Sequence, residues 1–370
     1  MRKIISYSNA QISKKDTALV TQAMRNGWGK NNNKYVNLFE KKFAKKLNIK
    51  YALATSSCTG ALHIAIAALD LPKGSEVIMA DSNWIATLSP VIHLGLKPVF
   101  VDVKLDNWGI DPNKIEKKIS KKTSLIIVTH LYGNACQMKI INKIAKKNGI
   151  PILEDSAEAL GSKINNKFCG TLSDVGCFSF HGSKTLTTGE GGMIVTNKKN
   201  IYEKCKILNN HGRTKKEYKL FSASYIGYKY KMTNLQAAVG LSQLKNLDKK
   251  VIKKRKIFRW YKKSLESIDI KMNVENKNEY NSYWMTNIVF NKKYKINIKK
   301  FIKYLEKKNI EARPFFPPLS QMKFFKFKKY NKNAMFLYKN SLNLPSSLDI
   351  RQNDIFYICN EIKKYLKDEK

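Results

Sequence analysis

An acidic segment follows an apolar run at residues 150–153, and it reads Glu154-Asp155-Ser156-Ala157-Glu158. Ligands of α/β sheets bind outside the carboxyl ends of the strands, so a carboxylate at this point could pair with a cationic ring nitrogen. Such a partner keeps the ring protonated and turns it into an electron sink. The same residues would also suit a helix N-terminus, because Asp and Ser cap helices well. The segment alone leaves both interpretations open.

A lysine, Lys184, lies in a segment rich in Gly, Ser and Thr that follows the apolar run 175–180. The segment reads His181-Gly182-Ser183-Lys184 and continues through Thr188-Gly189-Glu190-Gly191-Gly192. Burial near a cationic ring would favour the neutral amine, which can attack a carbonyl carbon. The competing interpretation is one more surface lysine in a flexible loop, since lysine is abundant throughout the chain.

The segment Ser56-Ser57-Cys58-Thr59-Gly60 lies at a predicted junction between a strand and a helix. Backbone N–H groups at a helix N-terminus bind anions, and Thr59 adds a hydroxyl, so a phosphate would fit here. Cys58 stands where a glycine is expected, which puts the geometry of the turn in question. The segment matches neither a dinucleotide-binding glycine fingerprint nor a P-loop, which argues against those two enzyme classes.

Composition sets broad limits on the function. The chain has 370 residues, 43% of them hydrophobic, six cysteines and a formal net charge of +41. The basic residues are spread along the whole chain and no aromatic-plus-basic RNA signature accompanies them, so compositional drift explains the charge better than a nucleic-acid partner. The cysteines form no zinc pattern, and no metal site is expected. With no apolar run long enough for a signal peptide or a membrane span, we expect a soluble, cytoplasmic protein.

The spacing of apolar residues predicts an α/β architecture. Seven apolar runs predict strands at residues 51–55, 76–80, 98–103, 124–130, 150–154, 175–180 and 193–196. Continuous apolar runs are typical of strands buried on both faces, hence of a mostly parallel sheet covered by helices. A long helical stretch at 234–265 then ends the alternation of short apolar runs and helices. We therefore expect a large domain at residues 1–245 and a small α/β domain at 246–370.

Taken together, these motifs resemble the DegT/StrS-type sugar aminotransferases, which are fold type I enzymes dependent on pyridoxal phosphate. The resemblance covers nearly the whole chain and is greatest to perosamine-synthase-like members. Its most specific parts are the following four segments: His130-Leu131-Tyr132-Gly133, Glu154-Asp155-Ser156-Ala157-Glu158, Ser179-Phe180-His181-Gly182-Ser183-Lys184 with the glycines after it, and Tyr230-Lys231-Met232-Thr233-Asn234-Leu235-Gln236-Ala237-Ala238. Their occurrence in this order is far more specific than any one of them.

The resemblance implies a role for each matching residue. Lys184 would bond covalently to the cofactor and then move the proton between cofactor and substrate, Asp155 would face the pyridine nitrogen, and Glu158 would lie near the phenolic oxygen. The other cofactor contacts would be Trp84 stacked on the ring, Cys58, Thr59 and Ser179 at the phosphate, and Asn234 reaching the phosphate from a neighbouring subunit. The sugar-nucleotide side would be lined by His211, Tyr225, Tyr228, Lys229 and Arg313. Core packing is an equally good interpretation for Trp84 and the tyrosines.

The activity implied is transfer of an amino group from L-glutamate to a nucleotide-linked 4-keto-6-deoxyhexose, giving a GDP-perosamine-type or a UDP- or dTDP-viosamine-type product for a surface glycan such as an O-antigen. A homodimer with active sites at the subunit interface is implied as well. The alternatives are a 3-keto sugar or a non-sugar ketone as substrate, a basic nucleic-acid-binding protein, and dehydration of the sugar. The dehydrating branch of the family carries His in place of the lysine, and Lys184 therefore favours amination.

Overall fold

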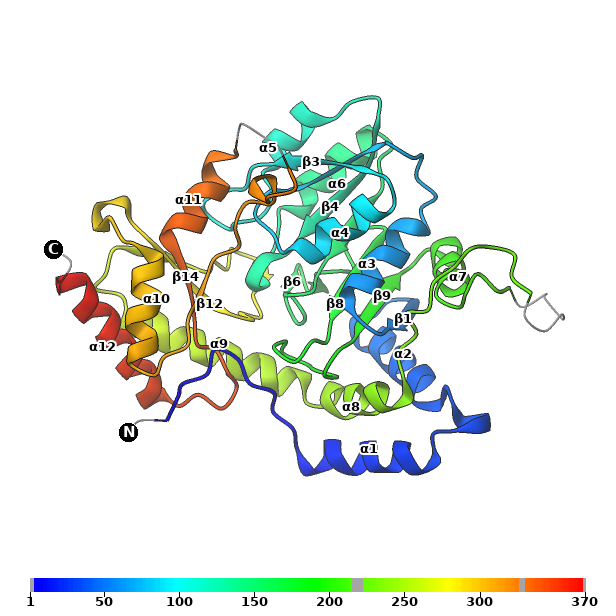
Figure 1. The fold of residues 1–370 in the computed structure, drawn as a ribbon, viewed down its shortest axis with the longest axis horizontal. Helices are drawn as coiled ribbons and strands as arrows, with labels where there is room; N and C mark the ends of the chain where they lie inside the picture. The colour runs from blue at the N-terminus through cyan, green and yellow to red at the C-terminus, as the bar shows by residue number, and fades with distance from the viewer. Residues whose placement is uncertain (1–2, 215–221, 326–329, 369–370) are drawn as a thin grey trace.

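The large sheet contains all seven strands expected from the apolar runs, in a computed structural model that describes residues 3–214, 222–325 and 330–368 (Figure 1). They are β1 (Tyr51–Thr55), β2 (Glu76–Ala80), β3 (Lys97–Val101), β4 (Thr123–Thr129), β5 (Ile152–Asp155), β8 (Val175–Ser179) and β9 (Gly192–Thr196). Their order across the sheet is β1-β9-β8-β5-β4-β2-β3, and β9 runs in the direction opposite to that of the other strands of this sheet. The predicted mostly parallel seven-stranded sheet is confirmed.

The sheet is buried on both faces because its central strands contain continuous apolar runs. In β4, Leu125 and Ile127 join one hydrophobic core, whereas Ile126 and Val128 join the core on the opposite face. Successive side chains of a strand point to opposite faces, so one continuous apolar run serves both cores. Helices cover each face: α3 (Cys58–Ala67), α4 (Ile85–His93) and α7 (Lys199–Leu208) on the first, and α6 (Met138–Lys147) on the second.

A second unit is built on a four-stranded antiparallel sheet of order β10-β12-β14-β13. Its strands are β10 (Ile270–Met272), β12 (Thr286–Phe290), β13 (Arg313–Pro314) and β14 (Ser341–Leu344), and its helices include α10 (Ile298–Lys307), α11 (Lys332–Asn340) and α12 (Gln352–Asp368). Near the N-terminus, Ile5 pairs with Ile310, so the start of the chain packs on this unit. The domain boundary at residue 245 stays a prediction.

The helical stretch predicted at 234–265 is present and consists of two helices, α8 (Asn234–Leu244) and α9 (Leu247–Ser264), with a short break between them. The break includes Asn246, whose φ of −107° and ψ of 9° leave the helical region. Asn competes with the helix for backbone hydrogen bonds, which favours a boundary. In Figure 1, α9 runs beneath both units, from α8 toward α12.

The remaining elements are peripheral to these two sheets. They are α1 (Lys14–Asn26), α2 (Lys34–Leu47), α5 (Pro112–Ile115), the small sheet of β6 (Lys163–Ile164), β7 (Lys167–Phe168) and β11 (Glu279–Tyr280), and five 3-10 turns at Gly29–Asn31, Glu116–Lys118, Leu131–Gly133, Lys292–Tyr294 and Leu319–Gln321. Helices α1 and α2 pack against α8. Within the described ranges, every helix is too short or too polar to cross a membrane.

Candidate active site

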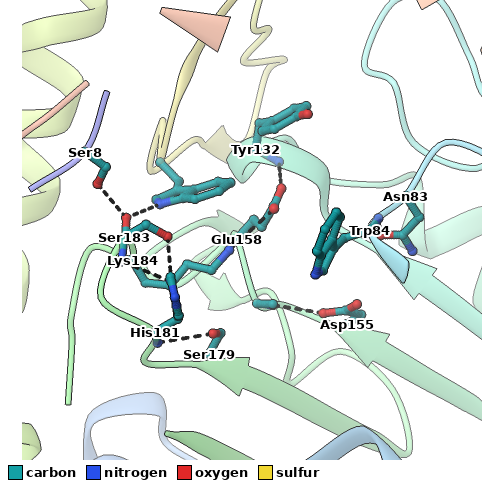
Figure 2. Close-up of polar contacts among 12 residues, drawn as sticks. Ser8, Asn83, Trp84, Tyr132, Asp155, Glu158, Ser179, His181, Ser183 and Lys184 are labelled. Carbon is teal, nitrogen blue, oxygen red and sulfur yellow. Dashed lines mark hydrogen bonds and ion pairs between the residues drawn. The ribbon is translucent and has the colours of Figure 1, made fainter. Parts of the chain in front are cut away.

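The predicted chemical residues converge at the carboxyl ends of the parallel strands (Figure 2). Asp155 is the last residue of β5 and Ser179 the last of β8, while Lys184 lies in the turn that follows β8. Because β5 and β8 are adjacent and parallel, their ends meet at one edge of the sheet. Figure 2 shows Lys184 and Glu158 pointing toward each other, with Trp84 on the side near Asp155.

Asp155 is a buried carboxylate, and its side chain accepts two hydrogen bonds. The Thr87 hydroxyl donates to Oδ2 at 2.5 Å, and the Ala157 amide donates to Oδ1 at 3.1 Å. No Lys, Arg or His in the described part of the chain forms an ion pair with it. Burial raises the pKa of Asp155 above its ordinary value, and the Thr87 hydrogen bond is the largest influence that lowers it. The site therefore suits a cation placed against this carboxylate.

Lys184 is not one of the surface lysines, because its side chain is only 13% exposed. Its Nζ lies 3.4 Å from Glu158 Oε1, and the other oxygen of Glu158 accepts a hydrogen bond from the Tyr132 amide at 2.9 Å. Tyr132 adopts a φ of +56°, an unusual conformation for a bulky residue, which indicates local strain at a functional site. Burial raises the pKa of Glu158 and the Lys184 ammonium opposes that shift. A primary amine is thus held against a carboxylate in a nearly dry site.

The N-terminus of α3 lies where the anion site is predicted. Cys58 and Thr59 are its first two residues, so their amides have no partner within the helix. Ser57 caps the helix by accepting from the Gly60 amide at 3.1 Å. Because Cys58 is helical, a glycine is not required there and the turn keeps its geometry. Burial raises the pKa of the Cys58 thiol, with Asp155 adding to the shift, so this side chain stays a neutral thiol.

Trp84 is 53% exposed, so its ring is not a core side chain. Its amide donates to Asn83 Oδ1 at 2.7 Å, and Asn83 donates to Thr129 Oγ1 at 2.7 Å, which ties the start of α4 to the end of β4. The ring lies 5.8 Å from that of Phe316. A large aromatic surface therefore remains open beside Asp155 and Glu158 (Figure 2).

Asn234 lies away from this cluster and makes three hydrogen bonds within its own chain. Its Oδ1 accepts from the Tyr35 amide at 3.0 Å, while its Nδ2 donates to Gly27 O at 2.7 Å and Asn31 O at 2.8 Å. The side chain thus fixes the connection between α1 and α2 to the start of α8. A contact from Asn234 to the phosphate of a neighbouring subunit stays a prediction.

The predicted sugar-nucleotide residues fall into two separate groups. His211, Tyr225, Tyr228 and Lys229 lie on the segment between α7 and α8, where the His211 amide donates to Tyr228 O at 2.9 Å. No contact in the described part of the chain joins them to Lys184 or Glu158. Arg313, on β13, is different: its guanidinium lies 5.8 Å from the Tyr7 ring, and both Glu158 and Arg313 influence the pKa of Tyr7. Arg313 thus lies beside Tyr7, whose pKa Glu158 also influences, while its role and those of the other four residues stay predictions.

Four residues of the site were missed by sequence reasoning: Tyr7, Ser8, Thr87 and Trp284. Ser8 Oγ and Trp284 Nε1 each donate to Ser183 O at 2.9 Å, and the Trp284 ring centroid lies 3.6 Å from Lys184 Nζ. Local patterns could not find Ser8 and Trp284, because their contacts with Ser183 join segments more than a hundred residues apart. Thr87 could have been suspected, since it lies one helical turn after Trp84.

The sequence matches the DegT/DnrJ/EryC1/StrS aminotransferase family over residues 10–363. It is 36% identical to GDP-perosamine synthase of Escherichia coli O157:H7, covering 99% of this chain and 100% of that one. Among solved structures, Helicobacter pylori PseC, an aminotransferase involved in the biosynthesis of pseudoaminic acid, has a TM-score of 0.92 at 26% identity, covering 99% and 100%. An E. coli GDP-4-keto-6-deoxy-D-mannose-3-dehydratase with bound hydrated PLP has a TM-score of 0.87 at 25% identity, covering 97% and 99%.

These matches agree with the geometry of the site. Asp155 is buried and forms no ion pair among the described residues, so it suits the ring nitrogen of pyridoxal phosphate, while the amine of Lys184 and the first amides of α3 suit its aldehyde and its phosphate. The prediction of this cofactor is confirmed. The predicted fold type I architecture and aminotransferase class are confirmed as well. The chain belongs to the DegT/DnrJ/EryC1/StrS aminotransferase family.

Proposed function

We propose that this enzyme moves the amino group of L-glutamate to C4 of a nucleotide-linked 4-keto-6-deoxyhexose, with GDP as the nucleotide and a perosamine-type sugar as the product. The observation that carries the proposal is Lys184, buried within 3.4 Å of Glu158 at the same strand ends as Asp155. The GDP-perosamine synthases of E. coli O157:H7 and Vibrio cholerae, 36% and 34% identical, support this choice of nucleotide over UDP or dTDP.

Each residue has a distinct task in this scheme. Pyridoxal phosphate, when bound, supplies an electron sink that stabilises charge at the reacting carbon. The carboxylate of Asp155 would stabilise a positive charge on the ring nitrogen, because a buried carboxylate without a cationic partner is unfavourable. Lys184 would take a proton from the donor's α-carbon and pass it to the cofactor, and in the second half-reaction it would take a proton from the cofactor and deliver it to the sugar carbon. Glu158 would hold the ammonium form of Lys184 while the lysine carries the proton within each half-reaction.

The anionic part of the substrate offers binding energy that can position the keto-sugar. The chain carries a net charge of +41, which favours approach of a nucleotide diphosphate. His211, Tyr225, Tyr228 and Lys229 are proposed to line the site of a neighbouring subunit, since no described contact brings them to Lys184 of their own chain. This arrangement requires a homodimer, and it would also bring Asn234 to the partner's phosphate site.

Dehydration is the rival reaction, and a 3-dehydratase is among the similar structures. Residue 184 is Lys, which favours amination over the His-dependent dehydration. His181 does not take its place, because its Nδ1 lies 3.0 Å from Ser183 Oγ and its Nε2 lies 3.5 Å from Glu190. We propose a cytoplasmic enzyme of surface-glycan biosynthesis, in keeping with the substrates.

The test is an acceptor panel. Purified enzyme with glutamate is offered GDP-, UDP- and dTDP-4-keto-6-deoxyhexoses, a 3-keto isomer and a simple ketone, and products are identified by mass spectrometry. A 4-amino sugar formed fastest from the GDP substrate is expected. Faster amination of a 3-keto sugar or of the simple ketone would contradict the proposal, and loss of water without gain of nitrogen would indicate the dehydratase.

A further inference from the structure

Trp284 belongs to the smaller unit but contacts the lysine of the larger one. It lies just before β12, it is buried, and its ring centroid is 3.6 Å from Lys184 Nζ. At this distance the negative face of an indole attracts an ammonium, most strongly where water is excluded. The lysine amine is therefore held on two sides, by the carboxylate of Glu158 and by the face of Trp284.

Trp284 is held at the edge of its indole, at one face of the ring and at its main chain. Its Nε1 donates to Ser183 O at 2.9 Å, which anchors the backbone next to Lys184. Its ring stacks on Tyr132 with centroids 6.0 Å apart and an angle of 11°. Its carbonyl oxygen accepts from the buried Lys254 at 3.0 Å. A side chain held in this way has little freedom to leave the lysine.

The backbone before Trp284 is strained, as is the backbone at Tyr132. Tyr283 has a φ of +47°, a conformation that a bulky side chain rarely adopts. It is kept there by stacking on Phe258 at 3.8 Å and by donation from its amide to Asn281 Oδ1 at 2.7 Å. Strain of this kind persists where the surrounding structure enforces it, and it clusters at active sites. Here it directs Trp284 toward Lys184, just as the strained Tyr132 directs its amide toward Glu158.

We infer that Trp284 is a positioning residue for the proton transfers of Lys184. This inference rests on the proposed function. After the lysine has taken the proton from the donor's α-carbon, its ammonium rests between the indole face and Glu158, within reach of the next carbon. Without the indole, the ammonium would spread over several rotamers, and each proton transfer would begin from a poorer position.

The experiment measures the glutamate half-reaction alone, as loss of the absorbance of the bound cofactor in single turnover. In Trp284→Leu we expect the rate to fall about 30-fold, the order of loss for a desolvated cation–π contact, while the Kd for glutamate changes less than about 3-fold. With glutamate deuterated at the α-carbon, the isotope effect should increase because proton transfer limits the rate more fully. Trp284→Phe keeps an aromatic face and should keep most of the rate.

A double-mutant cycle shows whether the effect acts through the lysine. In a Lys184→Ala background with ethylamine added as the proton acceptor, Trp284→Leu should change the rescued rate less than about 3-fold. As a matched control, Trp260→Leu removes an indole that contacts Lys253 instead of Lys184 and should leave rate and isotope effect unchanged. An equal loss in both backgrounds, or an unchanged rate in Trp284→Leu, would overturn the inference. If Trp284→Leu does not fold, a loss in Trp284→Phe as large as 30-fold with no change in isotope effect overturns it equally. Failure of the unmodified enzyme to react with glutamate would instead reject the proposed function.

Discussion

Replacing Thr87 with Val removes the hydroxyl that donates to Asp155 at 2.5 Å while keeping nearly the same volume. A hydrogen bond to a charged group contributes about 1.5–3 kcal/mol, and about 2 kcal/mol corresponds to a factor of about 30 in an equilibrium constant. Burial already raises the pKa of Asp155, with Thr87 as the largest opposing influence, so the pKa rises further in the variant. A protonated Asp155 attracts the cofactor ring less.

We therefore expect Thr87→Val to weaken binding of pyridoxal phosphate about 30-fold and Thr87→Ser to bind nearly as well as Thr. The titration is best made in a Lys184→Ala background, where no covalent bond contributes, by following quenching of tryptophan fluorescence in the apoprotein. The loss should be larger at pH 6 than at pH 8, because more of the Asp155 carboxyl is protonated at the lower pH. Equal affinity of the Val and Ser variants would refute the role of the hydroxyl.

Three further predictions concern the lysine and two buried ionisable groups. Lys184→Ala should bind the cofactor but lose turnover and covalent labelling upon borohydride reduction, which mass spectrometry of the chain can detect, and full activity would contradict the assignment. Burial raises the pKa of Glu40 to about 7, so folding takes up a proton between pH 4.5 and 7. Through this group, the free energy of unfolding falls as the pH rises over that range, by at most about 1.4 kcal/mol per pH unit, and Glu40→Gln should make the fall measured by urea unfolding less steep; an unchanged slope would contradict it. Burial lowers the pKa of Lys254 to about 7, so the free energy of unfolding rises as the pH increases from 7 to 10.5. Lys254→Met should make this rise less steep, and an unchanged dependence of the unfolding free energy on pH would contradict the burial of the ammonium.

Much of the large sheet could be predicted because each of its strands corresponds to a short apolar run in the sequence. The continuous apolar run at residues 125–128 requires burial on both faces, and parallel strands buried in this way bring their carboxyl ends to one edge. The nearness of Asp155, Ser179 and Lys184 follows from that rule, since each comes at or just after the end of a strand. Cys58 stands where a glycine is expected, and the structure explains why it is tolerated. It is the first residue of α3, where the backbone is helical and no positive φ is needed.

The rest of the site depends on contacts that no local pattern contains. Trp284 lies just before β12, and its indole contacts a lysine one hundred positions earlier. Ser8 hydrogen-bonds Ser183 across 175 positions. The break between α8 and α9 was missed because the helical spacing of apolar residues continues through Lys245 and Asn246, where only the backbone of Asn246 departs from the helix.

The most direct test of the central claim follows the nitrogen atom itself. The enzyme is incubated with ¹⁵N-labelled L-glutamate and GDP-4-keto-6-deoxyhexose, and the product is examined by mass spectrometry and NMR. The account predicts one ¹⁵N bonded to C4 of the sugar and one 2-oxoglutarate formed per product, both abolished in Lys184→Ala. A product that has lost the 3-hydroxyl and contains no ¹⁵N, or equal ¹⁵N transfer by Lys184→Ala, would contradict it.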